Sequence, residues 1–273
     1  MLAVSAALAL FAVWVPAAHA GRPGRVPRVA LPDPFPCAGC WQPGLRTSWQ
    51  WQLSGTVDTF FDVDMYDIDG FEARASLVDQ LHADGSAVVC YISAGSWEDW
   101  RPDAGKFPRS VLGRSNGWPG ERWLDIRKRW VLRPIMEARM DMCARKGFDG
   151  IEFDNVDGYQ NRAGFPLTGA DQLRYDVLLA NQAHRRGLSA ALKNDLGQIK
   201  RLLPYYDYAL NEQCHQYSEC GHLNAFVDAG KAVFGVEYAL PIADFCPQAN
   251  ARNFNFLKKH LSLKAWRIPC RGV

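Results

Sequence analysis

The run Gly150-Ile-Glu-Phe-Asp-Asn-Val-Asp-Gly-Tyr159 reads as a short buried strand that passes directly into a loop rich in carboxylates. A helix-like segment ending at Lys146-Gly147 precedes it, and another helical pattern begins near Gly169. A strand that delivers acidic side chains at its carboxyl end, between two helices, is how a (β/α) barrel builds an active site. The alternative is an ordinary solvated polar loop. The rest of the chain decides between the two interpretations.

Seven further segments have the pattern of strands, at residues 48–55, 62–67, 87–93, 188–194, 208–212, 232–238 and 262–268. Helical spacing is found at residues 71–84, 129–146, 170–186 and 250–260, and an irregular segment with three Trp spans 94–122. Eight strands alternating with helices predict an α/β protein, a (β/α)8 TIM barrel in a single domain. The alternative is an open doubly wound sheet, but no Gly-rich phosphate loop follows the first strand.

The N-terminal region has the features of an exported protein. Residues 1–20 resemble a signal peptide, with an apolar run and an Ala18-His19-Ala20 cleavage site, although no Lys or Arg precedes the run. The run is too short for a membrane span. Residues 21–45 are rich in Pro, Gly and Arg, which predicts a flexible leader. We expect a secreted, monomeric domain at residues 46–273, without stable membrane insertion after cleavage of the signal peptide.

Eight cysteines follow the predicted cleavage site, and an even count in an exported chain indicates disulfides. Cys214 with Cys220, and Cys246 with Cys270, are plausible pairs. The remaining four are Cys37 and Cys40, which have redox spacing, and Cys90 and Cys143, which either pair or stay as buried thiols. The net charge is only +2, so nothing in it indicates a nucleic-acid partner.

Polar side chains gather where the predicted strands end, and barrel active sites lie on that face. They are Asp69 after the second strand, Ser93 and Glu98 after the third, Asp154, Asn155 and Asp157 after the fourth, Lys193, Asn194 and Asp195 after the fifth, Asn211 and Glu212 after the sixth, and Glu237 and Tyr238 after the seventh. Each alone is an ordinary loop residue, but the repetition over six strand ends favours one shared cleft.

A cleft rich in carboxylates, without a Ser–His pattern, suits glycoside hydrolysis. That reaction needs one acid to protonate the leaving oxygen and a second to attack or to activate water. By position the best pair is Asp154 and Glu212, and Glu237 is the alternative partner. Glu152 lies two residues inside its strand, so we expect it to point into the barrel or its wall.

Six short motifs occur in order along the chain: Trp49–Gly55, Asp62–Asp69, Cys90–Glu98, Trp123–Ile126, Gly150–Asp157 and Leu192–Asn194. Together they resemble glycoside hydrolase family 114, the endo-α-1,4-polygalactosaminidases. The resemblance extends from Trp49 to about Trp266 and so covers the whole predicted domain. The cysteine-rich loop from Cys214 to Cys220 departs from the family pattern, and a disulfide-tethered loop at this place would reshape the cleft.

The resemblance implies a (β/α)8 barrel that cleaves α-1,4-linked galactosamine polymers without a cofactor or metal. It also implies two catalytic acids, an Asp closing strand four and a Glu closing strand six, which here are Asp154 as nucleophile and Glu212 as acid/base. The expected substrate-binding residues are Asp69, Tyr91, Ser93, Glu98, Asn155, Asp157, Lys193, Asn194, Glu237 and Tyr238.

Deacetylated galactosamine is cationic at moderate pH, so carboxylates are suitable ligands for its ammonium group. We expect Asp69, Glu98, Asp157 and Glu237 to supply them. Lys193 would instead bond a sugar hydroxyl or lower the pKa of a neighbouring carboxylate.

Three alternative functions remain open. Cys214, His215, Cys220 and His222 could hold zinc, but their spacing is not a common zinc pattern. Clustered Asp residues could hold Mg²⁺ or Ca²⁺ for phosphoester hydrolysis, although no regular calcium loop is present. A non-catalytic glycan-binding barrel would keep an aromatic cleft and lose one of the two acids, and both are present here.

Overall fold

The computed structural model describes residues 29–271, so the predicted signal peptide at 1–20 and the first part of the predicted leader lie outside the described residues. One compact unit begins at Leu31 and includes the rest of the described residues. Among the helices of the described part, none is long and apolar enough to cross a membrane.

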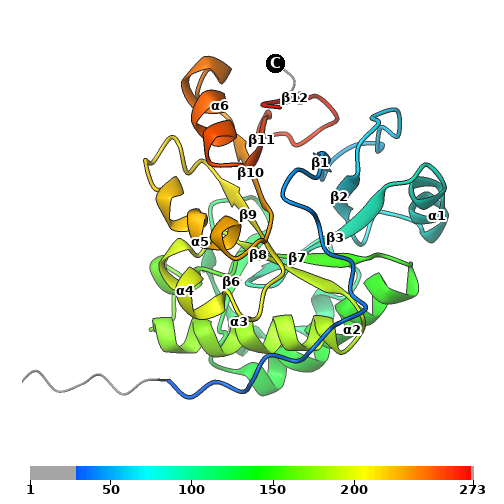
Figure 1. Cartoon of the computed structure of the whole chain (residues 1–273). Coiled ribbons are helices and arrows are strands. Elements are labelled where there is room, and N and C mark those ends of the chain that lie inside the picture. Colours follow the sequence, from blue (N-terminus) through cyan, green and yellow to red (C-terminus); the bar gives the residue numbers. More distant parts are fainter. Residues whose placement is uncertain (1–28, 272–273) are drawn as a thin grey trace, which may run out of the picture. The chain divides into compact units, whose positions relative to one another are not determined.

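Within residues 29–271, nine strands form one curled sheet (Figure 1). In sheet order they are β1 (Trp49–Gln52), β2 (Met65–Asp69), β3 (Ala87–Ser93), β7 (Gly150–Asp154), β8 (Ser189–Lys193), β9 (Tyr208–Glu212), β10 (Val233–Glu237), β11 (Asn255–Lys258) and β12 (Ile268–Pro269). Neighbours from β1 to β11 pair in parallel, and β12 pairs antiparallel with β11. The predicted α/β class and TIM-barrel-like architecture are confirmed.

Contacts outside the regular ladder link the first strand to the end of the chain. The indole nitrogen of Trp49 donates to the carbonyl of Asn255 at 2.9 Å, which connects β1 to β11. The backbone nitrogen of Leu53 donates to the carbonyl of Leu263 at 3.0 Å. These bonds bring the two end strands of the parallel series together, as a barrel requires.

Helices occupy most of the connections between strands. They are α1 (Ala75–Ala83), α2 (Arg129–Arg145), α3 (Gly169–His184), α4 (Ile199–Leu202), α5 (Asn224–Asp228) and α6 (Ile242–Ala251). Helices α2 and α3 pack side by side along the sheet (Figure 1). Helix α3 begins with a capping box, in which the Thr168 side chain accepts from Asp171 N and the Asp171 side chain accepts from Thr168 N.

Alternation of side chains along the strands produces two layers of core. One set of residues faces the barrel interior and includes Trp49, Trp51, Met65, Val89, Ala191, Tyr208, Leu210, Phe234, Val236 and Leu257. Alternate residues of the strands, such as Ile151, Phe153 and Leu192, pack under the helices. Because the side-chain period of a strand is two, the position of a residue within its strand fixes which layer it enters.

The predicted eighth strand was placed wrongly at residues 262–268. The last parallel strand is β11, and the helix before it is α6 rather than a helix at 250–260. Asn253, with φ of 61°, ends the helical region, and the buried Phe256 and Leu257 follow at once in the strand. Residues 262–267 form an irregular connection that carries Trp266, whose ring stacks on His260.

The predicted boundary at residue 46 is also too late. The backbone nitrogen of Phe35 donates to Asn181 Oδ1 at 2.7 Å, and the Tyr205 hydroxyl donates to the carbonyl of Pro32 at 2.6 Å. Residues 31–45 therefore lie against the domain rather than forming a free linker. A Pro-rich segment has no periodicity to reveal this docking, since side chains of distant helices and loops satisfy its backbone.

All eight cysteines are paired in the described residues, as Cys37–Cys40, Cys90–Cys143, Cys214–Cys220 and Cys246–Cys270. The two pairs expected from the sequence are thus confirmed.

The segment predicted to be irregular contains a small antiparallel sheet of β4 (Ser96–Glu98), β6 (Glu121–Leu124) and β5 (Leu112–Ser115). This sheet gives the long insertion after β3 a fixed framework.

Candidate active site

Strand alternation brings four charged residues to one end of the barrel interior. Glu152 and Asp154 are two residues apart in β7, so both face inward while Phe153 faces the helices. Lys193 ends β8 two residues after the inward-facing Ala191, so it also faces inward. Glu212 ends β9 two residues after the inward-facing Leu210 and faces the same way. Glu152 is fully buried below the others, as its position predicted.

Lys193 is the centre of this group. Its Nζ lies 2.6 Å from Glu152 Oε1, 3.1 Å from Asp154 Oδ1 and 3.4 Å from Glu212 Oε2. Because both oxygens lie close to the same nitrogen, Asp154 Oδ1 and Glu212 Oε2 are at most 6.5 Å apart. Both acids line one cleft of about 550 Å³. This proximity admits the separation of about 5–5.5 Å that retaining glycosidases use.

The two cleft acids have different hydrogen-bond environments. The Tyr91 hydroxyl donates to Asp154 Oδ2 at 2.8 Å, and Asn155 Nδ2 donates to the same oxygen at 3.1 Å. Glu212 accepts from the Tyr238 hydroxyl. Asp154 thus accepts hydrogen bonds from three donors, Tyr91, Asn155 and Lys193. Glu212 accepts one from Tyr238 and lies farther from the Lys193 ammonium.

Burial and neighbouring charges set the protonation of the groups beneath the cleft. Burial opposes the charge of Lys193, but Asp154, Glu152 and Glu212 outweigh it and raise the lysine pKa well above its ordinary value. Burial, and then the neighbouring Glu152, raise the pKa of Asp67 well above its usual range. Lys193 stays charged and neutralises part of the negative charge around it.

The residue after each of the three functional strands has a left-handed backbone. Asn155 follows β7 with φ of 63°, Asn194 follows β8 with φ of 51°, and Gln213 follows β9 with φ of 65°. Asn tolerates this conformation better than most residues. The turn lets the Asn194 side chain point back, where its Oδ1 accepts from Glu212 N at 2.9 Å. It thereby fixes the backbone that carries Glu212.

Glycine at position 95 permits a close approach beside Asp154. A Cβ at Gly95 would lie 1.7 Å from the carbonyl oxygen of Asn155. The backbone nitrogens of Ala94 and Gly95 both donate to the Asp154 carbonyl, at 2.9 and 3.0 Å. Any larger residue at position 95 would push the two loops apart and move the carboxylate.

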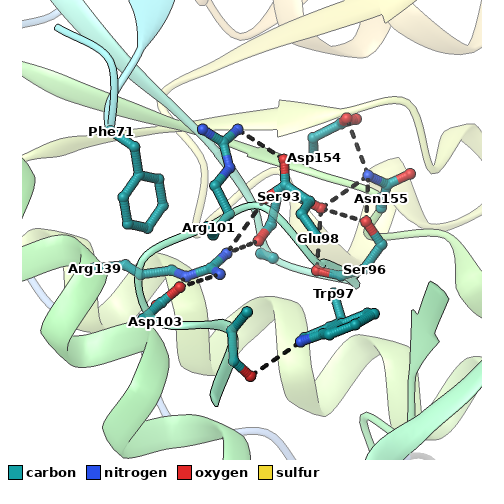
Figure 2. A network of polar contacts seen from close by, with 12 residues as sticks. Phe71, Ser93, Ser96, Trp97, Glu98, Arg101, Asp103, Arg139, Asp154 and Asn155 are labelled. Carbon is teal, nitrogen blue, oxygen red and sulfur yellow. Dashed lines mark hydrogen bonds and ion pairs between the residues drawn. The ribbon is translucent and has the colours of Figure 1, made fainter. Parts of the chain in front are cut away.

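Two of the predicted ammonium ligands, Asp69 and Glu98, already have a cationic partner. Arg101 donates to both oxygens of Asp69, at 2.9 and 2.7 Å, and to Glu98 Oε1 at 2.7 Å. Figure 2 shows Glu98 between Arg101 and Arg139, and the Arg139 guanidinium forms a second pair with Asp103. Both acids also line the cleft, so their role in binding substrate stays a prediction, with part of their charge balanced by these arginines.

Glu237 and Ser93 do not line the cleft. Glu237 lies one position from the inward-facing Val236, so it faces the outer layer, where its Oε1 accepts from His215 N at 2.8 Å. Glu237 anchors the disulfide-closed loop that follows Glu212. Ser93 is fully buried and bonds to Ser96 and Asn155 (Figure 2). Both residues hold the framework of the site instead of facing substrate.

Asp157 is the predicted ammonium ligand that remains available. It lines the cleft, and no Lys or Arg in the described part of the chain forms an ion pair with it. Burial, and then the nearby Asp154, raise the pKa of Asp157 to about 6. A cation bound at this carboxylate would lower that pKa again.

Sequence reasoning missed several residues of the cleft wall: Trp51, Leu53, Glu72, Trp100, Arg101, Trp118, Trp123, Leu261 and Leu263. Most lie in the insertion after β3 or in the irregular segment after β11, where no periodic pattern exists. The number of Trp residues was a signal, but it did not distinguish core from cleft. Trp51 is in fact buried, and its Nε1 donates to Glu152 Oε2 at 3.0 Å.

The group of Cys214, His215 and Cys220 is close enough to suggest a metal site. However, Cys214 and Cys220 form a disulfide, so neither offers a thiolate. Burial lowers the pKa of His215 to about 4, and its ring packs against Phe256. This group is better described as a small core beneath the loop after β9.

Comparison with known proteins gives concordant results. The family model of glycoside-hydrolase family GH114 matches residues 34–273. The crystal structure of Aspergillus fumigatus Ega3 in complex with galactosamine has 40% sequence identity and a TM-score of 0.81, covering 84% of this chain and 97% of that one. The glycoside hydrolase domain of PelA from Pseudomonas aeruginosa, at 15% identity and a TM-score of 0.65, covers 81% of this chain and 97% of that domain and shares the fold.

An uncharacterised protein of Deinococcus radiodurans is 27% identical over 202 residues, a match that spans 65% of this chain and 64% of that protein. The family match covers the strands that carry Asp154, Lys193 and Glu212, and it extends to the docked segment before β1. With a barrel fold and two carboxylates in one cleft, the chain belongs to glycoside hydrolase family 114.

Proposed function

We propose that this protein is an exported hydrolase that cleaves α-1,4-linked galactosamine polymers, with Asp154 as nucleophile and Glu212 as acid/base. The observation that carries the proposal is the pair of cleft carboxylates on either side of Lys193. The similar structure that contains galactosamine supports the substrate class. The four disulfides are consistent with export into an oxidising compartment.

The hydrogen bonds support this division of roles. A nucleophile must stay ionised, and Asp154 receives bonds from Tyr91, Asn155 and Lys193. Glu212, with fewer donors and a side chain that is 26% exposed, is the better proton carrier. In the first step the Asp154 carboxylate bonds to the anomeric carbon while Glu212 gives its proton to the departing oxygen. Glu212 then takes a proton from water, which displaces Asp154 and retains the configuration.

The proposal is tested with purified protein and an α-1,4-linked N-acetylgalactosamine polymer that has been partly deacetylated. We expect new reducing ends to accumulate with the wild-type protein and not with the Asp154→Asn/Glu212→Gln double variant. The activity should persist in EDTA. Binding without turnover by the wild-type protein would indicate a glycan-binding barrel instead, and loss of activity in EDTA would favour a metal-dependent hydrolase.

We assign recognition of the substrate ammonium to Asp157, and Asp157→Asn tests this. A charge-assisted hydrogen bond contributes about 1.5–3 kcal/mol, so KM for deacetylated polymer should rise about 10- to 100-fold with little change in kcat. Because the Asp157 pKa is raised to about 6, the wild-type KM should also rise as the pH falls below that value. The variant should lack this pH dependence.

A matched control is Asp228→Asn, which removes an exposed carboxylate outside the cleft. We expect its KM to equal that of the wild-type protein at each pH. The same polymer after chemical N-acetylation gives a second comparison. An equal loss of Asp157→Asn activity on acetylated and deacetylated polymer would mean that Asp157 does not recognise the ammonium group.

A further inference from the structure

Two exposed tryptophans line the cleft. In the described residues, seven large hydrophobic side chains are exposed, and three of them line the cleft: Trp100, Trp118 and Leu261. The Trp100 side chain is 51% exposed and that of Trp118 is 55% exposed. An exposed aromatic surface beside a binding cleft indicates a contact that the protein completes with a ligand.

Hydrogen bonds fix the backbone beside both tryptophans. Trp100 and Trp118 belong to the segment between β4 and β6, which the small antiparallel sheet closes. Asp99 N donates to the Gly120 carbonyl at 3.1 Å, and a Cβ added at Gly120 would lie 2.9 Å from Cζ3 of Trp100. Trp118 N donates to Asn116 Oδ1 at 3.1 Å. The turn therefore fixes the backbone beside both residues, and glycine at position 120 leaves room for the Trp100 ring.

This wall also carries negative charge. Glu72 is exposed and lines the cleft together with Trp100 and Arg101. Arg101 itself is neutralised by Asp69 and Glu98. A flat apolar ring beside a free carboxylate matches a hexosamine, which has an apolar C–H face and an ammonium group.

We propose that Trp100 and Trp118 form an outer sugar-binding subsite, which takes an α-linked hexosamine residue of the same polymer beyond the two residues at Asp154 and Glu212. The proposal rests on the proposed function and deepens it. The wall containing Trp100 and Trp118 is continuous with the cleft at Trp123 and Asp157, so one chain can reach both. The cleft would then engage an extended segment of polymer rather than a chain end alone.

The subsite predicts a dependence on chain length, which Trp100→Ala and Trp118→Ala test. Each variant should lose about tenfold in kcat/KM on long polymer, the factor expected for one aromatic stacking contact. On a short aryl α-galactosaminide, which reaches only the catalytic acids, both should match the wild-type protein. The control is Trp130→Ala, which removes a 74% exposed indole of α2 outside the cleft and should change neither rate.

Binding is measured separately, by titrating catalytically inactive Asp154→Asn/Glu212→Gln protein, with and without each Trp substitution, with the same polymer. Weaker binding by the Trp variants, with an unchanged thermal midpoint, supports the subsite even on a polymer that the wild-type protein does not cleave. Binding and polymer rates equal to those of the parent proteins would overturn it. An equal loss on the short substrate would also overturn it, since the defect would then lie at the catalytic acids.

Discussion

Asp154→Asn and Glu212→Gln are each expected to lower kcat on galactosamine polymer by about 10³-fold or more, because each removes one half of the acid pair. The thermal midpoint should change little, since both side chains are partly exposed and the substitutions preserve shape. The measurement is the rate of reducing-end formation over a range of protein concentrations.

Azide separates the two roles. A substrate with an activated leaving group needs little acid catalysis, so Glu212→Gln should still form the covalent intermediate, and azide should then release a glycosyl azide of retained configuration. Asp154→Asn has lost its nucleophile, and azide in its place should give the inverted product. If Glu212→Gln gave the inverted azide and Asp154→Asn the retained one, the two roles would be exchanged. Full activity in either variant would show that the substituted residue is not catalytic.

The strands were predictable because their apolar residues must fill two layers of core. The runs that became β3, β7, β9 and β10 are short, apolar and bounded by polar residues, so few other structures suit them. The error at β11 has a different cause. The segment 262–268 also alternates, but it lies at the surface, and alternation alone does not report burial.

The catalytic candidates were predictable from position at strand ends, whereas their neighbours required coordinates. Glu237 also ends a strand, yet it faces the outer layer, a difference that strict counting of alternation from Phe234 and Val236 would have revealed. No such count applies to Arg101, which comes from an irregular segment. Arg101 is close in sequence to Glu98 but distant from Asp69. Its contact with Asp69 depends on the path of the insertion after β3.

Lys193→Met is expected to have the largest combined effect on stability and activity. The substitution leaves Glu152 fully buried without its cation, and breaking a buried ion pair in this way costs about 3–5 kcal/mol. We expect urea unfolding at neutral pH to show a loss of that size. The deficit should narrow as the pH falls, because protonation of Glu152 removes the uncompensated charge.

The double variant Lys193→Met/Glu152→Gln separates the structural role of the lysine from its effect on the cleft. Removing both charges should restore most of the unfolding free energy, since no buried ion is left unpaired. Activity should stay low, because Asp154 and Glu212 still lack the ammonium between them. A double variant with near wild-type kcat would show that Lys193 serves only to balance Glu152, and that the cleft acids function without it.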